Sequence, residues 1–284
     1  MLKKSGFLLF LFMFVILLAA CSTSGGNVDV TPYSTRDIPV VAPVTEVPSA
    51  EPTILPTTPI VTEKPTSTPK PTNKVDSEKP MICLTFDDGP NTPSTGKILD
   101  VLEANHARAT FFVVGNRIEK HHTVIERAHK LGCEIGNHTF DHKKKLTELD
   151  KDGLYAEINQ TDELLFKYIG TNTPFIRPPG GSYNSETLKM VDRPLVNWNV
   201  DTLDWKTRNK NAIIQEVIGK VKDGDIVLMH DLYSTTADAV EYIVPKLLEQ
   251  GFQLVTLTEM FEAKGYTMER GYIYFFAGEK GIRH

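Results

Sequence analysis

Residues 81–90 read Met-Ile-Cys-Leu-Thr-Phe-Asp-Asp-Gly-Pro, and this stretch decides the fold. Its first six residues form a short, mostly apolar run, as in a strand that is buried on both faces of a parallel sheet. Asp87 and Asp88 follow directly, and Gly89-Pro90 then turns the chain. In a parallel α/β domain, functional side chains gather where the strands reach their carboxyl ends. We therefore expect a buried strand that ends in a functional site.

Outward from this stretch, short apolar runs alternate with segments of helical periodicity. Such alternation over about 180 residues favours one α/β domain with a parallel sheet, open or closed into a barrel. The aromatic run Tyr272–Phe276 is a further candidate strand. The expected strands are Met81–Phe86, Ala109–Val114, Cys133–Gly136, Phe175–Arg177, Leu195–Trp198, Ile226–Met229 and Gln253–Thr256. The expected helices are Thr95–Asn105, Arg117–Leu131, Thr147–Ile169, Ser185–Val191, Ala212–Val221 and Ala237–Leu248.

The first twenty residues have the pattern of an export signal. Two lysines precede the uncharged apolar core Phe7–Leu18, which is shorter than the roughly 20 residues that a spanning helix needs. The sequence Leu18-Ala-Ala-Cys21 resembles the processing box of bacterial lipoproteins, in which the cysteine becomes the lipid-modified first residue. We expect a signal peptide over 1–20 and a lipid anchor at Cys21. The alternative is an ordinary signal peptide with an incidental cysteine.

Residues 21–79 differ sharply in composition from the rest of the chain. Ten of the eighteen prolines and eleven threonines lie between Ser22 and Lys79, with Tyr33 as the single aromatic residue. Such a segment cannot bury a hydrophobic core, and it is typical of a disordered, semi-extended linker. We expect it to carry the α/β domain, residues 80–264, away from a membrane surface. The role of residues 265–284 is not indicated.

Composition excludes one class of partner and leaves one question about the cysteines open. A net charge of −5 and a pI near 5.9 give no basic patch of the kind that nucleic-acid binding needs. Cys83 and Cys133 lie in apolar runs and are expected as small buried side chains. A disulfide between them remains an alternative in an oxidising compartment.

Two histidines after the third expected strand suggest a metal site. His138 and His142 are four residues apart, so that one turn or tight loop can direct both imidazoles at one ion. With one carboxylate from Asp87-Asp88 they form a two-histidine, one-carboxylate set with a position open for water. Consecutive side chains at a strand end point in different directions, so the second aspartate can address that water. Alternatively, the histidines are solvated and the aspartates only cap the turn.

Arg177 and His230 end two further apolar runs. An unpaired guanidinium at a buried strand end would be costly, so Arg177 needs a carboxylate partner, for which Asp87 is the candidate. This pair is either functional or simply structural. His230 can act as an acid if a carboxylate holds its tautomer and raises its pKa, and Asp204 is the candidate partner. Trp205 either walls a pocket and stacks on a sugar or packs in the core.

Taken together, these residues resemble the polysaccharide deacetylases of carbohydrate esterase family four, also called the NodB-homology domain. Five motifs of that family occur here in order: T-F-D-D-G-P from Thr85, H-T-x-x-H from His138, R-P-P-x-G from Arg177, D-x-x-D-W from Asp201, and L-x-H from Leu228. The resemblance implies a distorted (β/α) barrel of about seven parallel strands.

The resemblance also implies a role for each motif residue. A divalent ion, zinc in the first instance and otherwise cobalt, nickel or manganese, would be bound by the three residues Asp88, His138 and His142. Asp87 would be the general base held by Arg177, and His230 the general acid supported by Asp204. The backbone N–H of Gly180 would contact the oxyanion, whereas Trp205 and Leu228 would wall the pocket. Family members often have an aromatic residue where this chain has Gly180, which puts the range of substrates in doubt.

The implied activity is metal-dependent removal of N-acetyl groups from a polysaccharide, with N-acetylglucosamine of peptidoglycan as the expected substrate. The enzyme would act as a monomer at the outer face of the bacterial cytoplasmic membrane. Two alternatives remain at this stage. One is an esterase that removes O-acetyl groups from a glycan such as xylan with the same site, and the other is a lipoprotein that binds glycan without catalysing a reaction.

Overall fold

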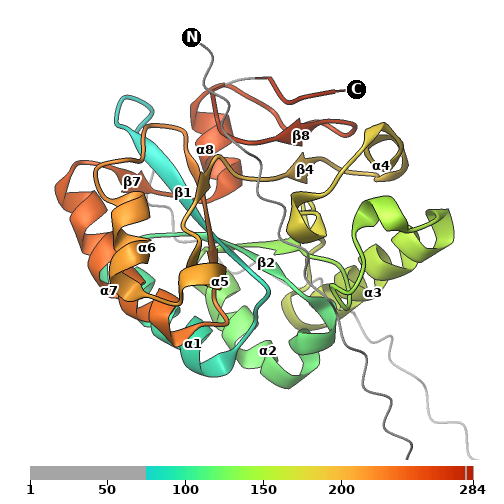
Figure 1. Cartoon of the computed structure of the whole chain (residues 1–284), viewed down its shortest axis with the longest axis horizontal. Helices are drawn as coiled ribbons and strands as arrows, with labels where there is room; N and C mark the ends of the chain where they lie inside the picture. Colours follow the sequence, from blue (N-terminus) through green and yellow to red (C-terminus); the bar gives the residue numbers. More distant parts are fainter. Residues whose placement is uncertain (1–74, 279, 284) are drawn as a thin grey trace, which may run out of the picture. The chain divides into compact units, whose positions relative to one another are not determined.

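The computed structural model describes residues 75–278 and 280–283. The predicted signal peptide, the lipid attachment at Cys21 and the linker up to residue 74 lie outside the described residues. Figure 1 shows the order of the elements along the chain. The strands are β1 (Met81–Asp87), β2 (Thr110–Val113), β3 (Glu134–Asn137), β4 (Leu195–Val196), β5 (Val200–Asp201), β6 (Ile226–His230), β7 (Gln253–Leu254) and β8 (Ile273–Tyr274). The α-helices are α1 (Thr92–Ala104), α2 (Gly115–Lys130), α3 (Lys151–Ile169), α4 (Ser185–Met190), α5 (Asp204–Thr207), α6 (Lys210–Val217), α7 (Ser234–Glu249) and α8 (Leu257–Ala263).

The strands form a curled, parallel sheet. Five strands lie in the order β3-β2-β1-β6-β5, while β7 pairs with the start of β1 and β4 pairs with β8. All these pairings are parallel. Single bridges continue the order from β3 through Ile176 to β4, and an antiparallel bridge joins Phe276 to Asp225, just before β6. The predicted α/β architecture with parallel strands is thus confirmed, and the bridges close it into a distorted barrel.

Several elements differ from the prediction for local chemical reasons. The expected strand Phe175–Arg177 is reduced to bridges at Ile176, because Pro178 and Pro179 follow and have no N–H to continue a ladder. The long helix expected from Thr147 begins instead after Asp150, whose side chain accepts a hydrogen bond from the Gly153 N–H at 2.8 Å. The short elements β5, α5 and α8 were not expected.

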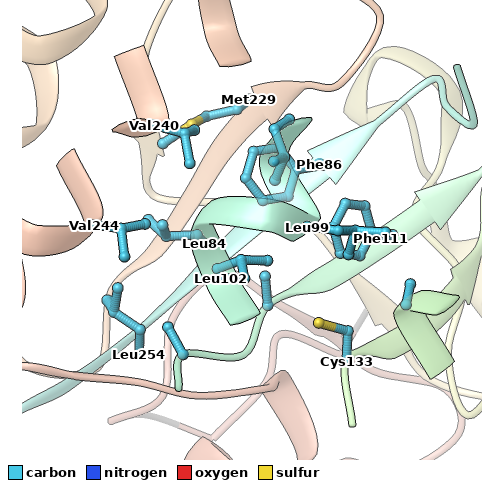
Figure 2. Packing of buried hydrophobic residues seen from close by; sticks show 14 of the residues in the cluster. Leu84, Phe86, Leu99, Leu102, Phe111, Cys133, Met229, Val240, Val244 and Leu254 are labelled. Atoms are coloured by element: carbon cyan, nitrogen blue, oxygen red, sulfur yellow. The ribbon is translucent and has the colours of Figure 1, made fainter. Parts of the chain in front are cut away.

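The alternating side chains of β1 divide the core in two. Ile82, Leu84 and Phe86 pack against α1, α2, α6 and α7, in the cluster drawn in Figure 2. Met81 and Cys83 point to the other face, into the barrel interior, where Phe112, Phe175 and residues of α8 surround them. Because side chains alternate along a strand, Thr85 and Asp87 share this interior face. The interior of the barrel is therefore apolar where β1 begins and polar where it ends.

The C-terminal aromatic run contributes to this barrel. Ile273 and Tyr274 form β8 and are 0% and 4% exposed, and Ala277 is buried as well. Tyr274 packs edge-on against Phe261 of α8, with ring centroids 5.3 Å apart.

Cys83 and Cys133 are both buried and free. Within the described part of the chain, no helix has the length and apolar character that crossing a membrane requires.

Candidate active site

The carboxyl ends of β1 and β6 place two titratable side chains opposite each other. Asp87 and His230 are direct partners in the register of these two strands. On each strand, residues on the same face as Asp87 or His230, such as Cys83 and Ile226, fill the barrel interior. Asp87 and His230 therefore also point into the barrel, at its polar end. Asp87 is 3% exposed, and the His230 side chain is 12% exposed. Both side chains are thus largely buried, and His230 is the more accessible of the two.

Three side chains can hold a metal ion. The Asp88 carboxylate lies 3.5 Å from the Nε2 of His138 and 3.4 Å from the Nε2 of His142. One donor atom from each residue lies within 4.8 Å of the other two. Asp88 and His142 adopt left-handed backbone conformations, with φ of 69° and 56°, which turn their side chains toward the site. Two imidazoles and one carboxylate are a donor set that suits a catalytic zinc ion or a similar divalent metal.

Hydrogen bonds orient these candidate ligands. The Nδ1 of His138 lies 2.8 Å from the Arg177 carbonyl oxygen and donates to it, which leaves Nε2 as the donor atom for an ion. The loop between the two histidines is fixed by Glu157 of α3, whose carboxylate accepts the N–H groups of Phe140 and Asp141 at 2.8 and 3.0 Å. The residues present therefore fit a divalent ion in orientation as well as in chemistry.

Electrostatic interactions favour the deprotonated, metal-binding forms of two of the three candidate ligands, Asp88 and His142. Burial acts to raise the pKa of Asp88, but the hydrogen bond from His138 and the neighbouring histidine charges hold it well below its usual range. Burial, together with the charge of His138, lowers the pKa of His142. For His138 burial is outweighed by Asp87 and Asp88, which raise its pKa. A proton would leave His138 when an ion binds, so the affinity for the ion decreases as the pH falls.

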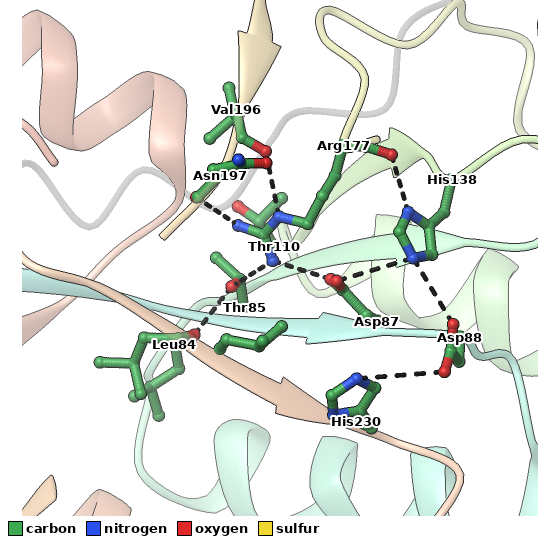
Figure 3. Close-up of polar contacts among 12 residues, drawn as sticks. Leu84, Thr85, Asp87, Asp88, Thr110, His138, Arg177, Val196, Asn197 and His230 are labelled. Carbon is green, nitrogen blue, oxygen red and sulfur yellow. Dashed lines mark hydrogen bonds and ion pairs between the residues drawn. The ribbon is translucent and has the colours of Figure 1, made fainter. Parts of the chain in front are cut away.

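Arg177 is fully buried, and Figure 3 shows the polar partners of its guanidinium. Its Nη1 donates to a carboxylate oxygen of Asp87 and to the hydroxyl of Thr85, both at 2.7 Å. Its Nε and Nη2 donate to the carbonyl oxygens of Val196 and Asn197 at 3.1 and 2.9 Å. The guanidinium also lies 4.0 Å from the centre of the Phe112 ring. This network fixes Asp87 in one orientation, with its second oxygen 3.7 Å from His138.

His230 is held by a buried carboxylate, as its sequence pattern predicted. Its Nδ1 lies 2.7 Å from Asp204, which is 0% exposed and also accepts from the His230 N–H and the Thr236 hydroxyl, each at 2.7 Å. Burial alone would lower the pKa of His230, but the hydrogen bond and charge of Asp204, with the charges of Asp87 and Asp88, raise it to about 9. A pKa in this range keeps the imidazole protonated at neutral pH.

The other predicted site residues lie around this centre. Gly180 is exposed, with φ of 59° and open space where a side chain would begin, so no aromatic wall stands there. Trp205 lies on α5, one residue after Asp204, and is 47% exposed, so it does not have the burial that the alternative of plain core packing requires. Leu228 is 3% exposed and lies two residues before His230 on the same face of β6.

Two contacts near His230 were missed by the sequence analysis. Asp231 is 1% exposed, accepts a hydrogen bond from Thr95 of α1, and lies against the backbone of Gly89. Tyr233 lies with its ring centroid 5.9 Å from that of His230, and the Arg208 guanidinium lies over the Tyr233 ring. Both residues lie within three positions of the L-x-H motif, but an aspartate and a tyrosine in a loop carry no distinctive spacing of their own.

The contact between Gly89 and Asp231 yields a test of the turn that carries Asp88. A Cβ at Gly89 would lie 2.2 Å from both carboxylate oxygens of Asp231. Gly89→Ala is therefore expected to destabilise the domain by about 1–3 kcal/mol in urea unfolding. Gly96, inside α1, has no atom within 4 Å of such a Cβ. Gly96→Ala is the control and should stabilise the domain by about 0.5–1 kcal/mol; equal behaviour of the two variants would contradict the packing.

Comparison with known proteins agrees with this geometry. Residues 74–193 match the family model "Polysaccharide deacetylase". The peptidoglycan-N-acetylmuramic acid deacetylase PdaC of Bacillus subtilis is 40% identical over 67% of this chain and 40% of its own length. A peptidoglycan-N-acetylglucosamine deacetylase of Bacillus cereus is 36% identical over 65% of this chain and 69% of its own length. The solved structure of a family 4 acetyl xylan esterase from Clostridium thermocellum, in complex with a cobalt ion, has a TM-score of 0.67 at 32% identity and covers 70% of this chain and 100% of that chain.

The chain belongs to the polysaccharide deacetylase family. The family resemblance read from the five motifs is thereby confirmed. The chain spans about two fifths of the length of the Bacillus subtilis relative. Members of this family are named for different acetylated glycans, as the peptidoglycan and xylan relatives illustrate, so membership leaves the substrate open.

Proposed function

We propose that this protein is a metal-dependent hydrolase that removes N-acetyl groups from peptidoglycan and releases acetate, with N-acetylglucosamine as the sugar. The observation that supports this function most strongly is the pairing of Asp87 with His230 across adjacent strand ends, beside three donor atoms that lie within 4.8 Å of one another. A base and an acid on two sides of one reacting carbon are what amide hydrolysis requires.

In this proposal each residue has one role. A divalent ion held by Asp88, His138 and His142, with zinc as the candidate metal, would supply Lewis-acid polarisation of the acetyl carbonyl and lower the pKa of the attacking water. Asp87 accepts the proton of that water, while Arg177 fixes its orientation. His230, kept protonated by Asp204, donates a proton to the amine nitrogen as the C–N bond breaks.

The remaining residues would bind the substrate. The Gly180 N–H would stabilise the oxyanion, a contact of a kind worth roughly 3–4 kcal/mol where one donor was removed from comparable sites. Trp205, which is exposed beside the acid, would stack on a sugar ring, and Leu228 would close the pocket behind the acetyl group.

The same proposal places the enzyme outside the cytoplasm as a monomer, anchored to the membrane through a lipid at Cys21. The Pro- and Thr-rich segment would extend at about 3 Å per residue and carry the domain toward the cell wall. Fractionation of cells that express Cys21→Ala should show the protein released from the membrane fraction, since a lipid-modified residue is then absent. Unchanged membrane attachment would contradict the lipid anchor.

Acetate release by the purified protein tests the activity. We expect release from peptidoglycan and from an oligomer of N-acetylglucosamine, loss of release after chelation, and recovery on addition of zinc. Asp87→Asn should reduce turnover below about 1% of wild type, since an amide cannot accept the proton. Tight glycan binding by the wild-type protein without any acetate release would instead support a binding protein without catalytic function.

O-acetyl ester hydrolysis is a second candidate, supported by the similarity to the acetyl xylan esterase structure. An ester oxygen is a better leaving group than an amine nitrogen, so the need for a protonated His230 separates the two reactions. Acetylated xylan should therefore be included in the same assay. Faster release from xylan than from any N-acetylated glycan would favour the esterase.

A further inference from the structure

The rim of the site beside His230 carries an aromatic and cationic group that the mechanism does not use. The Tyr233 ring lies 5.9 Å from the His230 ring, and the Arg208 guanidinium carbon lies 3.1 Å from the centre of the Tyr233 ring. The Nε of Arg208 donates to the carbonyl oxygen of Trp205 at 2.9 Å. Arg208 and Tyr233 therefore contact each other, and Arg208 joins them to Trp205 of α5, next to the acid.

The backbone of this rim is held in an unfavourable conformation at both ends of α5. Leu203 and Arg208 flank the helix with φ of 52° and 48°, a left-handed conformation that residues other than glycine and asparagine rarely adopt. The Leu203 N–H donates to the Asp201 side chain at 2.8 Å, and the Arg208 N–H donates to the Asp204 carbonyl oxygen at 3.0 Å. Conformations of this kind persist where the surroundings impose them, and they cluster at functional sites.

The charge of Arg208 is not neutralised by the protein. Arg208 forms no ion pair with a carboxylate among the residues that the structure describes, and its side chain is exposed. A guanidinium has about five N–H donors, so donors remain for a ligand after the bond to Trp205 and the side-chain hydrogen bond with Tyr233. A planar guanidinium fixed in this way matches the geometry of a carboxylate.

The chemistry of the substrate indicates what would reach this group. In the proposed reaction His230 donates its proton to the nitrogen on C2 of the sugar, and the substituent on the adjacent carbon, C3, is bonded to the neighbouring ring carbon and so lies close to that nitrogen. In a muramic acid residue without a stem peptide that substituent is a lactyl ether with a free carboxylate, whereas N-acetylglucosamine carries a neutral hydroxyl. In a glycan that alternates the two sugars, the lactyl carboxylate is either on the reacting sugar or on its neighbour.

We propose that Arg208, fixed on Tyr233, is a specificity-determining residue that binds a sugar carboxylate next to the reacting acetamide. This inference rests on the proposed deacetylase function and narrows its substrate to carboxylate-bearing glycans over neutral ones. Arg208 acts on binding of the sugar, and the proton transfers of Asp87 and His230 do not pass through it.

Two variants separate the charge of Arg208 from its backbone conformation. Arg208→Asn removes the charge and keeps a residue that tolerates the left-handed conformation, whereas Arg208→Lys keeps the charge without the planar fork. Lys130→Asn is the control for the loss of one exposed positive charge, since Lys130 lies at the far end of α2 and its side chain is 73% exposed. The substrates are peptide-free peptidoglycan strands, the same strands with their lactyl carboxylates amidated, and a neutral oligomer of N-acetylglucosamine.

The measured quantity is the ratio of kcat/KM on the native strands to kcat/KM on the amidated strands, in the zinc-loaded protein at low salt. We expect this ratio to fall roughly fivefold in Arg208→Asn, the upper range for an exposed charge pair, and to be unchanged in Lys130→Asn. Arg208→Lys should retain part of the preference. Equal losses on native and amidated strands would show a structural role and overturn the proposal.

Two further readouts identify which sugar supplies the carboxylate and test the proposed deacetylase function separately from the Arg208 contact. Mass spectrometry of the muramidase digest identifies which sugar loses its acetyl group: loss from muramic acid places the carboxylate on the reacting sugar, and loss from glucosamine places it on the neighbour. Binding of native and amidated strands to the zinc-loaded Asp87→Asn protein needs no turnover. If binding depends on the carboxylate charge but the wild type shows no turnover, the deacetylase proposal is refuted and the Arg208 contact stands. If the wild type turns over and neither binding nor turnover depends on that charge, the Arg208 proposal is refuted and the deacetylase stands.

Discussion

His230→Ala is expected to lower kcat on an N-acetylated glycan by about 10²–10⁴ and to leave KM within a few-fold of wild type. An amine leaves only after it is protonated, and His230 is the protonated side chain that faces Asp87 across the site. Steady-state kinetics on a soluble N-acetylglucosamine oligomer would measure this effect. Turnover close to wild type would remove His230 from the mechanism.

The pH profile provides the control. Burial lowers the pKa of His230, whereas the hydrogen bond and charge of Asp204 outweigh it and raise the pKa to about 9. Asp204→Asn removes the charge, so the pKa falls and the acid form is lost at a lower pH. The alkaline limb of the kcat profile should therefore move to lower pH in this variant. If the alkaline limb does not move in Asp204→Asn, a group other than His230 is responsible for that limb.

Arg177→Met is expected to destabilise the domain by about 3–5 kcal/mol, because it leaves the buried Asp87 carboxylate without its ion-pair partner. Urea unfolding with circular dichroism detection gives the change in free energy directly. Arg193→Met is a matched control, since Arg193 pairs with Asp162 at 2.8 Å but retains 16% side-chain exposure. Arg193→Met should lower the free energy of unfolding by less than Arg177→Met does.

The double variant Arg177→Met/Asp87→Leu tests the cause of that loss. If the unpaired carboxylate is responsible, removing Asp87 as well should recover much of the stability while activity stays absent. A double variant as unstable as Arg177→Met alone would assign the loss to the other bonds of Arg177, to Thr85, Val196 and Asn197.

The residues that could be predicted from sequence are those that combine a distinctive type with a strand end. Asp87, Asp88, His138 and His230 follow apolar runs, and parallel strands bring such positions together whatever the details of the loops. The strand order was not predictable from the periodicity, and the expected strand Phe175–Arg177 is reduced to single bridges at Ile176.

Tertiary contacts explain the rest of what was missed. Arg208 meets Tyr233 across 25 positions of sequence, and neither residue has a pattern that points to the other. The two-residue strand β5 is too short for an alternating pattern to be recognised, and it pairs because the neighbouring strand β6 presents an edge. The role assigned to each residue of the site remains a prediction until the variants above are measured.

The left-handed backbone at Asp88, Thr139 and His142 has a consequence for the evolution of this domain. At these positions φ lies between 56° and 69° without the freedom of glycine, and each such residue costs about 1–3 kcal/mol. Selection for stability alone would replace them with glycine or asparagine and would lose two candidate ligands. A lineage released from selection for catalysis should therefore drift toward a more stable and inactive descendant, with the changes concentrated in these two loops.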